Sequence, residues 1–236
     1  MFALSARDAP MKGRRTYASP PCLAAEIDPA YFDPLARDPE QARDVARWRR
    51  AERARLADLR KALGQEGRAR ASRAIADHLE QALSACNTGH GTILAGYWPI
   101  KGEPDLRPLL EKLHEAGVTI ALPVVETRAA PLVFRRWAPG TKMVRGDWNI
   151  PVPPHDAQEL TPDVTLAPCL GWDGDCYRLG WGGGYFDRTL AALRARPLAI
   201  GIALADARLK TIYPQPHDIP LDLIVTEAGV LARRSG

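Results

Sequence analysis

A glycine-rich segment flanked by charged residues is the part of this sequence best suited to chemistry. The stretch "RLGWGGGYFDRTL", residues 178–190, places four glycines between Arg178 and Asp187. Glycine loses more backbone entropy on folding than other residues, so a glycine cluster indicates a special conformation or a close ligand. An arginine can form two parallel hydrogen bonds to a phosphate, and a carboxylate oxygen is a ligand that Mg²⁺ prefers. These residue types point to a site for a phosphate group and a metal ion.

The elements on either side of this segment would position it. The preceding "DVTLAPCL", residues 163–170, predicts a buried strand, and the following "YFDRTLAALRA", residues 185–195, predicts a helix. A loop that enters a helix presents unpaired backbone N–H groups, which suit an anion. Neither the P-loop pattern nor GxGxxG is present, since no Gly-Lys-Ser/Thr occurs and Tyr185 stands where a third glycine is required. The loop is therefore either another kind of phosphate cradle or only a tight turn, with Asp187 and Arg188 as exposed helix residues.

The rest of the chain alternates between strand-like and helix-like segments. Strands are expected within residues 91–99, 118–125, 132–137, 163–170, 198–204 and 221–227, and helices within 45–63, 68–85, 105–117 and 184–195. Such alternation favours an α/β fold with three layers, in which helices cover both faces of a mainly parallel open sheet. Ligands of these sheets gather at the carboxyl ends of the strands, where the glycine loop would lie.

Length and composition limit the number of domains and the classes of protein that this chain can represent. A chain of 236 residues suits one large domain with an extension. Residues 1–38 are rich in proline and show no period, which predicts a loosely structured extension before a single α/β domain at 39–236. No apolar run approaches the roughly 20 residues that span a bilayer, and the N-terminus lacks the apolar core of a secretory signal. We therefore expect a cytoplasmic protein with no membrane partner.

Charge and cysteine usage argue against two further classes of protein. The net charge of +4 is concentrated in the first helices, where basic residues alternate with acids and indicate a solvated face rather than a nucleic-acid surface. The four cysteines are widely spread and form no CxxC pair, which argues against a zinc site or a disulfide framework. Small molecules are the expected partners, with no nucleic acid, and the chain is expected to act as a monomer or weak dimer.

The glycine loop resembles the signature of the 5-formyltetrahydrofolate cyclo-ligase family, also called methenyltetrahydrofolate synthetase. The family pattern Arg-Leu-Gly-x-Gly-x-Gly-Tyr-Tyr/Phe-Asp-Arg is matched by Arg178, Leu179, Gly180, Gly182, Gly184, Tyr185, Phe186, Asp187 and Arg188. The resemblance covers nearly all of the chain except the extension. It implies a Rossmann-like fold of the NagB/RpiA type and an ATP- and Mg²⁺-dependent cyclisation of 5-formyltetrahydrofolate to 5,10-methenyltetrahydrofolate. That reaction passes through an iminium phosphate and releases ADP and phosphate.

The resemblance also implies which residues contact ATP and Mg²⁺. Family members carry two basic residues four apart near the domain start, which fall on Arg49 and Arg53 when counted back from Gly64. The implied ATP contacts are Arg49, Arg53, Arg178, Leu179, Gly180, Trp181, Gly182, Gly183, Gly184, Tyr185 and Phe186. Arg178 and Tyr185 would be catalytic. The implied metal ligands are Asp187 and, in "PHDIPLDLIVTE", Asp218. The alternatives are two solvated helix arginines and an aspartate that only stabilises a turn.

The folate contacts implied by the resemblance are Glu103, Trp181 and Tyr185. Glu103 lies in "GYWPIKGEPDLRPLL", which resembles a strand-loop-helix segment that carries a substrate-binding glutamate. Its carboxylate would accept hydrogen bonds from the donor edge of the pterin, although an acid just before a helix is favourable in any case. Trp181 and Trp98 are both candidate stacking platforms; Trp181 lies inside the loop, and Trp98 is expected in the core.

Three positions depart from the family pattern and keep alternatives open. Gly183 stands where some members have lysine, and in "GDWNIPVPP" Asn149 and Val152 replace the glycine and glutamate of a Gly-Ile-Pro-Glu-Pro element. One alternative is a related ATP-dependent enzyme that acts on another formamide- or amide-bearing heterocycle. The other is a non-catalytic binder of folate or RNA, which the basic N-terminal helices motivate.

Overall fold

The chain divides into two units, residues 1–48 and residues 49–236. The computed structural model describes residues 39–234, so the prediction of a loose extension at residues 1–38 lies outside the described residues and stays a prediction. Every element after α1 belongs to the second unit. None of the described helices combines the length and the apolar character needed to cross a bilayer.

The helices form where apolar residues recur at helical spacing. They are α1 (Pro39–Ala62), α2 (Gly64–Ala85), α3 (Arg107–Glu115) and α4 (Tyr185–Ala192), which confirms the four expected helices. α1 and α2 follow each other almost directly. Gly64 has a φ of +64°, a left-handed conformation that ends the first helix and that glycine adopts without a steric cost.

The sheet confirms the prediction of a mainly parallel α/β fold. Its strand order is β11-β10-β9-β6-β1-β2-β3, in which the five central strands are parallel and both edge strands are antiparallel. The strands are β1 (Ile93–Ala95), β2 (Thr119–Val124), β3 (Val133–Trp137), β6 (Val164–Pro168), β9 (Leu198–Ile202), β10 (Leu223–Thr226) and β11 (Gly229–Arg233). The sequence predicted all of these except β11.

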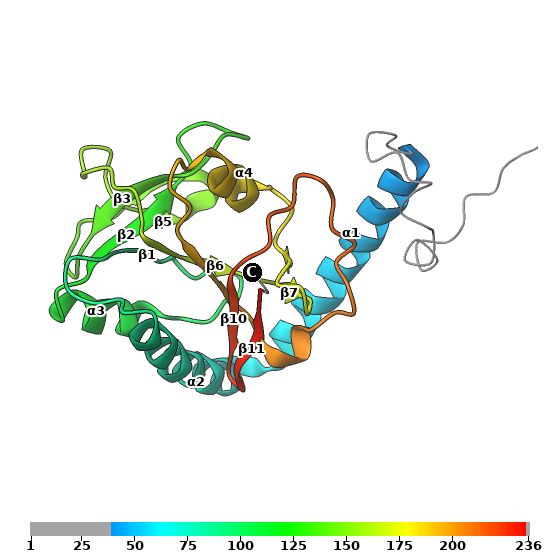
Figure 1. Cartoon of the computed structure of the whole chain (residues 1–236), viewed down its shortest axis with the longest axis horizontal. Coiled ribbons are helices and arrows are strands. Elements are labelled where there is room, and N and C mark those ends of the chain that lie inside the picture. The colour runs from blue at the N-terminus through cyan, green and yellow to red at the C-terminus, as the bar shows by residue number, and fades with distance from the viewer. Residues whose placement is uncertain (1–38, 235–236) are drawn as a thin grey trace, which may run out of the picture. The chain divides into compact units, whose positions relative to one another are not determined.

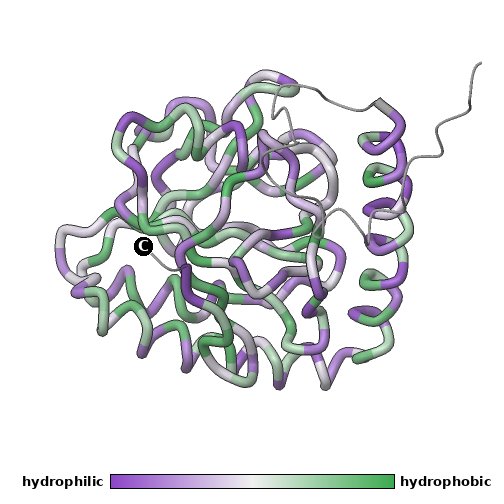
Figure 2. The backbone as a smooth tube through the Cα atoms, turned by 45° about the vertical axis from the view of Figure 1, so that its right-hand side comes forward, coloured by the Kyte–Doolittle hydropathy of each residue, from purple (hydrophilic) through white to green (hydrophobic). Residues whose placement is uncertain are grey.

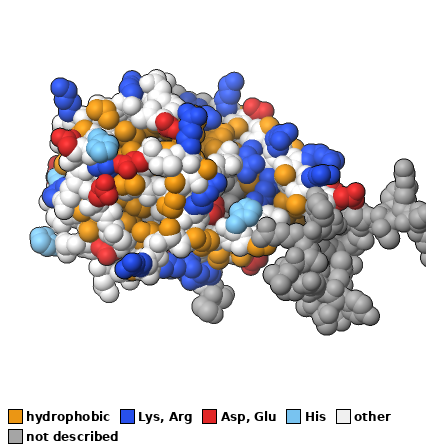
Figure 3. All heavy atoms as spheres, turned by 90° about the horizontal axis from the view of Figure 1, so that it is seen from above, with side chains coloured by type: hydrophobic (Ala, Val, Ile, Leu, Met, Phe, Trp, Pro, Cys, Tyr) orange, Lys and Arg blue, Asp and Glu red, His pale blue; other side chains and the backbone are white. Residues whose placement is uncertain are grey.

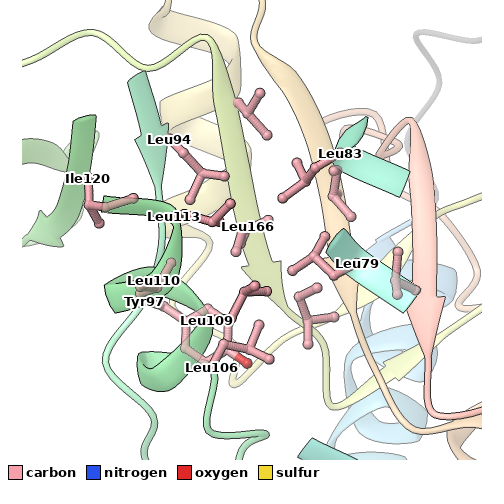
Figure 4. Close-up of a cluster of buried hydrophobic side chains, with 14 of the residues drawn as sticks. Leu79, Leu83, Leu94, Tyr97, Leu106, Leu109, Leu110, Leu113, Ile120 and Leu166 are labelled. Atoms are coloured by element: carbon pink, nitrogen blue, oxygen red, sulfur yellow. The ribbon is translucent and has the colours of Figure 1, made fainter. Parts of the chain in front are cut away.

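Alternate residues of each strand face opposite sides of the sheet and build two different layers. On one side, α2 and α3 cover the sheet, and their leucines pack against large aliphatic side chains such as Leu94, Ile120 and Leu166 (Figures 1 and 4). On the other side, where α4 lies, the strands contribute small residues such as Ala95 and Ala121 (Figure 1). Figure 2 shows hydrophobic and hydrophilic residues alternating along the helices, as expected for elements that are buried on one face only.

Two short hairpins lie outside the main sheet and were not predicted. One pairs β4 (Val144–Arg145) with β5 (Pro151–Val152) around a 3-10 turn at Asp147–Asn149. The other pairs β7 (Gly171–Trp172) with β8 (Arg178–Leu179). This second hairpin stands between β6 and the glycine loop, so the loop does not follow the buried strand directly, as the sequence suggested, but follows β8.

Candidate active site

A pocket of about 610 Å³ opens at the carboxyl ends of the parallel strands. Its wall includes Trp98 after β1, Pro123 near the end of β2, and Pro168, the last residue of β6. The wall also includes every predicted site residue: Arg49, Arg53, Glu103, Arg178, Leu179, Gly180, Trp181, Gly182, Gly183, Gly184, Tyr185, Phe186, Asp187 and Asp218. The expected position of the loop is therefore confirmed. Figure 3 shows one face of the protein, on which Lys and Arg side chains border exposed hydrophobic ones.

The glycine loop offers three backbone donors that have no acceptor among residues 39–234. In the part of the chain that the structure describes, no group accepts a hydrogen bond from the N–H of Gly182, Gly183 or Gly184. The φ angles of Gly182 and Gly184 are +101° and +64°, values that residues with a side chain rarely adopt. Consecutive free N–H groups before a helix form a nest suited to an anion.

Two arginines hold this loop through its carbonyl groups. Arg53 Nε donates to the carbonyl of Gly180 at 2.8 Å, and Arg188 Nη1 donates to that of Gly183 at 2.6 Å. Burial, followed by the charge of Arg49, lowers the pKa of Arg53. The loop is thereby surrounded by positive charge while its N–H groups stay free, which is the environment of a phosphate site.

Arg178 and Asp187 form an ion pair beside the loop. Arg178 Nη2 lies 2.8 Å from Asp187 Oδ2, and only 7% and 15% of the two side chains are exposed. The N–H of Ile219 donates to the other carboxylate oxygen at 3.3 Å. Arg178 Nε is buried and has no partner within the described residues, so this guanidinium keeps donor capacity for a further group.

A second arginine-aspartate pair joins two segments that lie far apart in the sequence, α1 and the loop before β10. Arg49 contacts both carboxylate oxygens of Asp218, and its Nε donates to the carbonyl of Ile212 at 3.0 Å. Burial raises the pKa of Asp218, but hydrogen bonds from Arg49 and from the Gln215 N–H outweigh it and hold that pKa below its ordinary value. Asp218 is therefore ionised over the physiological pH range.

Asp187 and Asp218, the two predicted metal ligands, both line the pocket. No cluster of three or more His, Cys, Asp or Glu side chains that could hold a metal occurs among the described residues. Asp187 and Asp218 line the same pocket, and each already contacts an arginine. Mg²⁺ is commonly bound by one or two carboxylates together with substrate phosphates and water. The donor set fits Mg²⁺ that arrives with a polyphosphate, not a metal held by the protein alone.

Glu103 is a buried carboxylate whose two oxygens both accept hydrogen bonds. Its Oε1 accepts from Trp181 Nε1 at 2.9 Å, and its Oε2 accepts from the N–H of Ile100 at 3.0 Å. Only 7% of Glu103 is exposed, and burial raises its pKa above the ordinary value of 4.5, although both hydrogen bonds oppose that rise. Beside it, Lys101 Nζ lies 4.4 Å from the centroid of the Trp181 ring.

The sequence analysis missed two residues at this site. Trp148 is 65% exposed in the β4–β5 hairpin, and its ring meets that of Tyr185 edge-on at 5.6 Å. In the sequence, the segment "GDWNIPVPP" stands out for its differences from the family pattern at Asn149 and Val152. A tryptophan next to an asparagine in a predicted turn is a further signal, because such a tryptophan is exposed and available to a ligand. The Trp148 and Asn149 φ values are +53° and +61°. Trp98, expected in the core, is partly buried against it and also lines the pocket.

Arg60 is the second missed residue and contradicts the expectation of a solvated basic face for its helix. It is 2% exposed, and its Nη2 donates to the carbonyl of Cys169 at 2.6 Å. Its Nε and Nη1 have no partner in the described part of the chain. Burial lowers the pKa of Arg60, and the nearby Glu103 carboxylate raises it. A buried cation thus lies near the buried carboxylate of the pocket.

The three cysteines that the structure describes are free thiols. Cys86 is exposed, whereas Cys169 and Cys176 are buried. Burial raises the pKa of the Cys169 thiol to about 12 and that of Cys176 to about 11, so both remain protonated at neutral pH.

A parallel α/β sheet with a pocket at its strand ends, lined by aromatic and charged side chains, is typical of enzymes that act on small molecules. The model of the 5-formyltetrahydrofolate cyclo-ligase family matches residues 45–227, and the chain belongs to this family. This confirms the resemblance identified in the sequence and the prediction that the protein is an enzyme.

Relatives and solved structures agree with this membership. The chain is 34% identical to a 5-formyltetrahydrofolate cyclo-ligase of Mycolicibacterium smegmatis over 153 residues, which are 61% of this chain and 78% of the relative. It is 32% identical to the protein of that name from Escherichia coli over 143 residues, 58% of this chain and 79% of the relative. The structure of Aquifex aeolicus 5,10-methenyltetrahydrofolate synthetase is similar with a TM-score of 0.67 at 29% identity, over 80% of this chain and 94% of that one.

Proposed function

We propose that this protein catalyses the ATP- and Mg²⁺-dependent cyclisation of 5-formyltetrahydrofolate to 5,10-methenyltetrahydrofolate. The observation that carries the proposal is that the three free N–H groups of Gly182, Gly183 and Gly184 and the buried carboxylate of Glu103 line one pocket. The first set of groups suits phosphate, and the second suits the donor edge of a pterin. Family membership supplies the reaction that needs both.

The reaction requires activation because a formamide is a poor electrophile. The formyl oxygen attacks the γ-phosphorus of ATP; the new O–P bond forms as the bond to ADP breaks, which leaves an iminium phosphate. The neighbouring folate amine then attacks the formyl carbon and loses its proton. Finally the C–O bond breaks, and its electron pair leaves with the phosphate. Positioning and charge stabilisation are the protein's contributions to such a transfer.

The polar groups of the pocket match these steps. The loop N–H groups, Arg178 and Arg53 hold the phosphates, because each presents donors to the same space. Arg49 lines the same pocket and would also contact the ATP, although its ion pair with Asp218 offsets its charge. As the γ-phosphate moves to the formyl oxygen, the donors of Arg178 stabilise the charge that develops on it.

Glu103, Trp181 and Tyr185 would bind the folate. Glu103 accepts hydrogen bonds from the pterin, and the rings of Trp181 and Tyr185 provide flat surfaces for it. Asp187 and Asp218 would hold Mg²⁺, which supplies positive charge to the phosphate oxygens. His217 lines the pocket as well but is largely exposed.

The case for a different heterocyclic substrate rests on Val152 rather than on Asn149. Asn149 has a left-handed backbone conformation, which asparagine adopts more readily than most residues, so it can replace a glycine there without a change in the chain path. Val152 is 8% exposed and lines the pocket, and it removes a carboxylate from this wall. Turnover of 5-formyltetrahydrofolate would count against this alternative. The cytoplasmic location, the lack of a nucleic-acid partner and the monomeric or weakly dimeric state remain predictions.

The proposal is tested by ultraviolet absorbance of the purified protein with 5-formyltetrahydrofolate, ATP and Mg²⁺. We expect the methenyl chromophore to grow only when all three are present and to stop growing when a chelator removes Mg²⁺. Asp187→Ala and Arg178→Ala should abolish the signal, whereas the exposed matched controls Asp156→Ala and Arg194→Ala should keep it. Absence of turnover by folded, ATP-binding protein would refute the assignment of the substrate.

A further inference from the structure

Trp181 and Glu103 form a contact that the proposed reaction does not explain. The indole Nε1 donates to Glu103 Oε1 at 2.9 Å, although the two residues lie 78 positions apart in the sequence. Glu103 is 7% exposed, whereas Trp181, which belongs to the glycine loop, is 37% exposed. A solvent-accessible indole therefore occupies one oxygen of a carboxylate that has little other access to the pocket.

The same oxygen is the acceptor that a folate would need. Glu103 Oε2 accepts a hydrogen bond from the backbone N–H of Ile100, whereas Oε1 accepts one from a side chain, the indole of Trp181. An indole N–H and the N–H groups of a pterin are the same kind of donor and make the same kind of hydrogen bond. Because the site around Glu103 is buried, the two donors compete for one position.

We propose that Trp181 is an internal competitor for Glu103, whose N–H holds the substrate-binding carboxylate in the ligand-free protein and is displaced by the folate. This inference rests on the proposed function, because it takes the pterin of a reduced folate as the displacing group. The contact also satisfies the buried carboxylate while no ligand is present, which avoids the cost of an unpaired buried charge.

Displacement of Trp181 also affects the phosphate site, because both belong to one loop. Trp181 directly precedes Gly182, Gly183 and Gly184, whose N–H groups are free. Arg53 holds the loop at the carbonyl of Gly180 and Arg188 holds it at that of Gly183, so a movement of the indole changes the backbone between these two points, at Gly182. Folate and nucleotide should therefore bind cooperatively, since the release of the indole by one ligand changes the loop that the other contacts.

The variant Trp181→Phe separates competition from stacking, because it keeps an aromatic ring and removes the N–H. If the N–H competes with the folate, its loss destabilises only the ligand-free state, and 5-formyltetrahydrofolate should bind more tightly without nucleotide. Because the bond that is lost from the ligand-free state is a hydrogen bond to a charged group, we expect the Kd for the folate to fall about tenfold. Trp98→Phe is the matched control, because it changes an indole of the same pocket with no hydrogen bond to Glu103.

The measurement is isothermal titration of wild type and variants with 5-formyltetrahydrofolate, with and without ADP and Mg²⁺. We expect Trp181→Phe alone to bind the folate about tenfold more tightly and to lose most of the effect of ADP on folate affinity. If Trp181→Phe is poorly folded, Trp181→Met provides the same test, because methionine also lacks the N–H. It lacks an aromatic ring as well, so the expected gain in folate affinity is smaller.

Two outcomes would overturn the inference in different ways. If wild type binds and converts the folate but Trp181→Phe binds it equally or more weakly, Trp181 is a stacking surface only and the competition is refuted. If wild type neither binds nor converts 5-formyltetrahydrofolate, the proposed function itself fails, and the inference fails with it.

Discussion

The apolar face of the central strands differs sharply from the segments that follow their carboxyl ends. Alternate strand residues such as Leu94 and Leu166 are fully buried against α2 and α3 in an apolar layer. A few residues beyond the carboxyl ends of β1 and β6, the chain carries Glu103 and the Cys169 carbonyl that binds Arg60. Both charged side chains are buried, and two nitrogens of Arg60 have no hydrogen-bond partner among the described residues. The strands thus provide stability with their side chains and chemistry with the segments that leave them. Mutations in the apolar layer should therefore change the free energy of unfolding, whereas mutations in the pocket should change the kinetic constants.

Leu166→Ala should produce the largest effect, on stability alone. The side chain is fully buried at the centre of the sheet, so its truncation leaves a cavity and should lower the free energy of unfolding by about 2–5 kcal/mol. Urea unfolding measures this loss, and the kcat of the fraction that remains folded should stay near the wild-type value. A fall in kcat of the folded enzyme would show that the apolar layer and the pocket are not separable.

Gly182→Ala should reverse this pattern, with a large loss of turnover. A Cβ at this position would lie 3.3 Å from the Arg53 guanidinium carbon, and the φ of +101° is unfavourable for alanine. We expect kcat/KM to fall by about a hundredfold as the loop N–H groups lose their arrangement. Gly140→Ala is the control, since Gly140 also has a positive φ, +82°, but is exposed with open space around it. Equal losses of activity in both variants would mean that backbone strain, not the site, is responsible.

Glu103→Gln should weaken folate recognition by roughly tenfold or more in KM, because a hydrogen bond to a charged group is replaced by a weaker neutral one. The wild-type KM should also depend on pH. Burial raises the pKa of Glu103 above 4.5, so the carboxylate forms, and KM falls, as the pH rises from that value through the folded-state pKa. Steady-state kinetics across this range test the idea, and a pH dependence unchanged in Glu103→Gln would assign it to another group.

Lys112→Ala should have the smallest effect. Lys112 pairs with Glu80 between α3 and α2, but the two side chains are 63% and 41% exposed, so water and salt screen the attraction. We expect a loss of less than about 1 kcal/mol in thermal or urea unfolding and no change in kinetics. A larger loss of stability would mean that this exposed ion pair contributes more to the packing of α2 and α3 than screening by water and salt allows.

The sequence predicted every strand of the main sheet except β11, and the resemblance to a family supplied the predicted residues that line the pocket. Buried strands and amphipathic helices have distinct periods, and an α/β alternation places the loop before α4 at the strand ends. Hairpins with strands of two residues, such as β7–β8, carry no period and could not be predicted. The burial of Arg60 was also invisible, because a helix arginine among acids has the pattern of a solvated face until the tertiary contacts are known.

The distribution of the thiols has a consequence for handling the protein in the laboratory. Oxidants and alkylating reagents attack the thiolate, and Cys169 and Cys176 are both buried and protonated at neutral pH. Among the described cysteines, Cys86 at the end of α2 is the one open to such reagents. A dye attached to Cys86 would lie on the helical side of the sheet. Cys169, whose carbonyl accepts the hydrogen bond from Arg60, should stay unmodified under the same conditions.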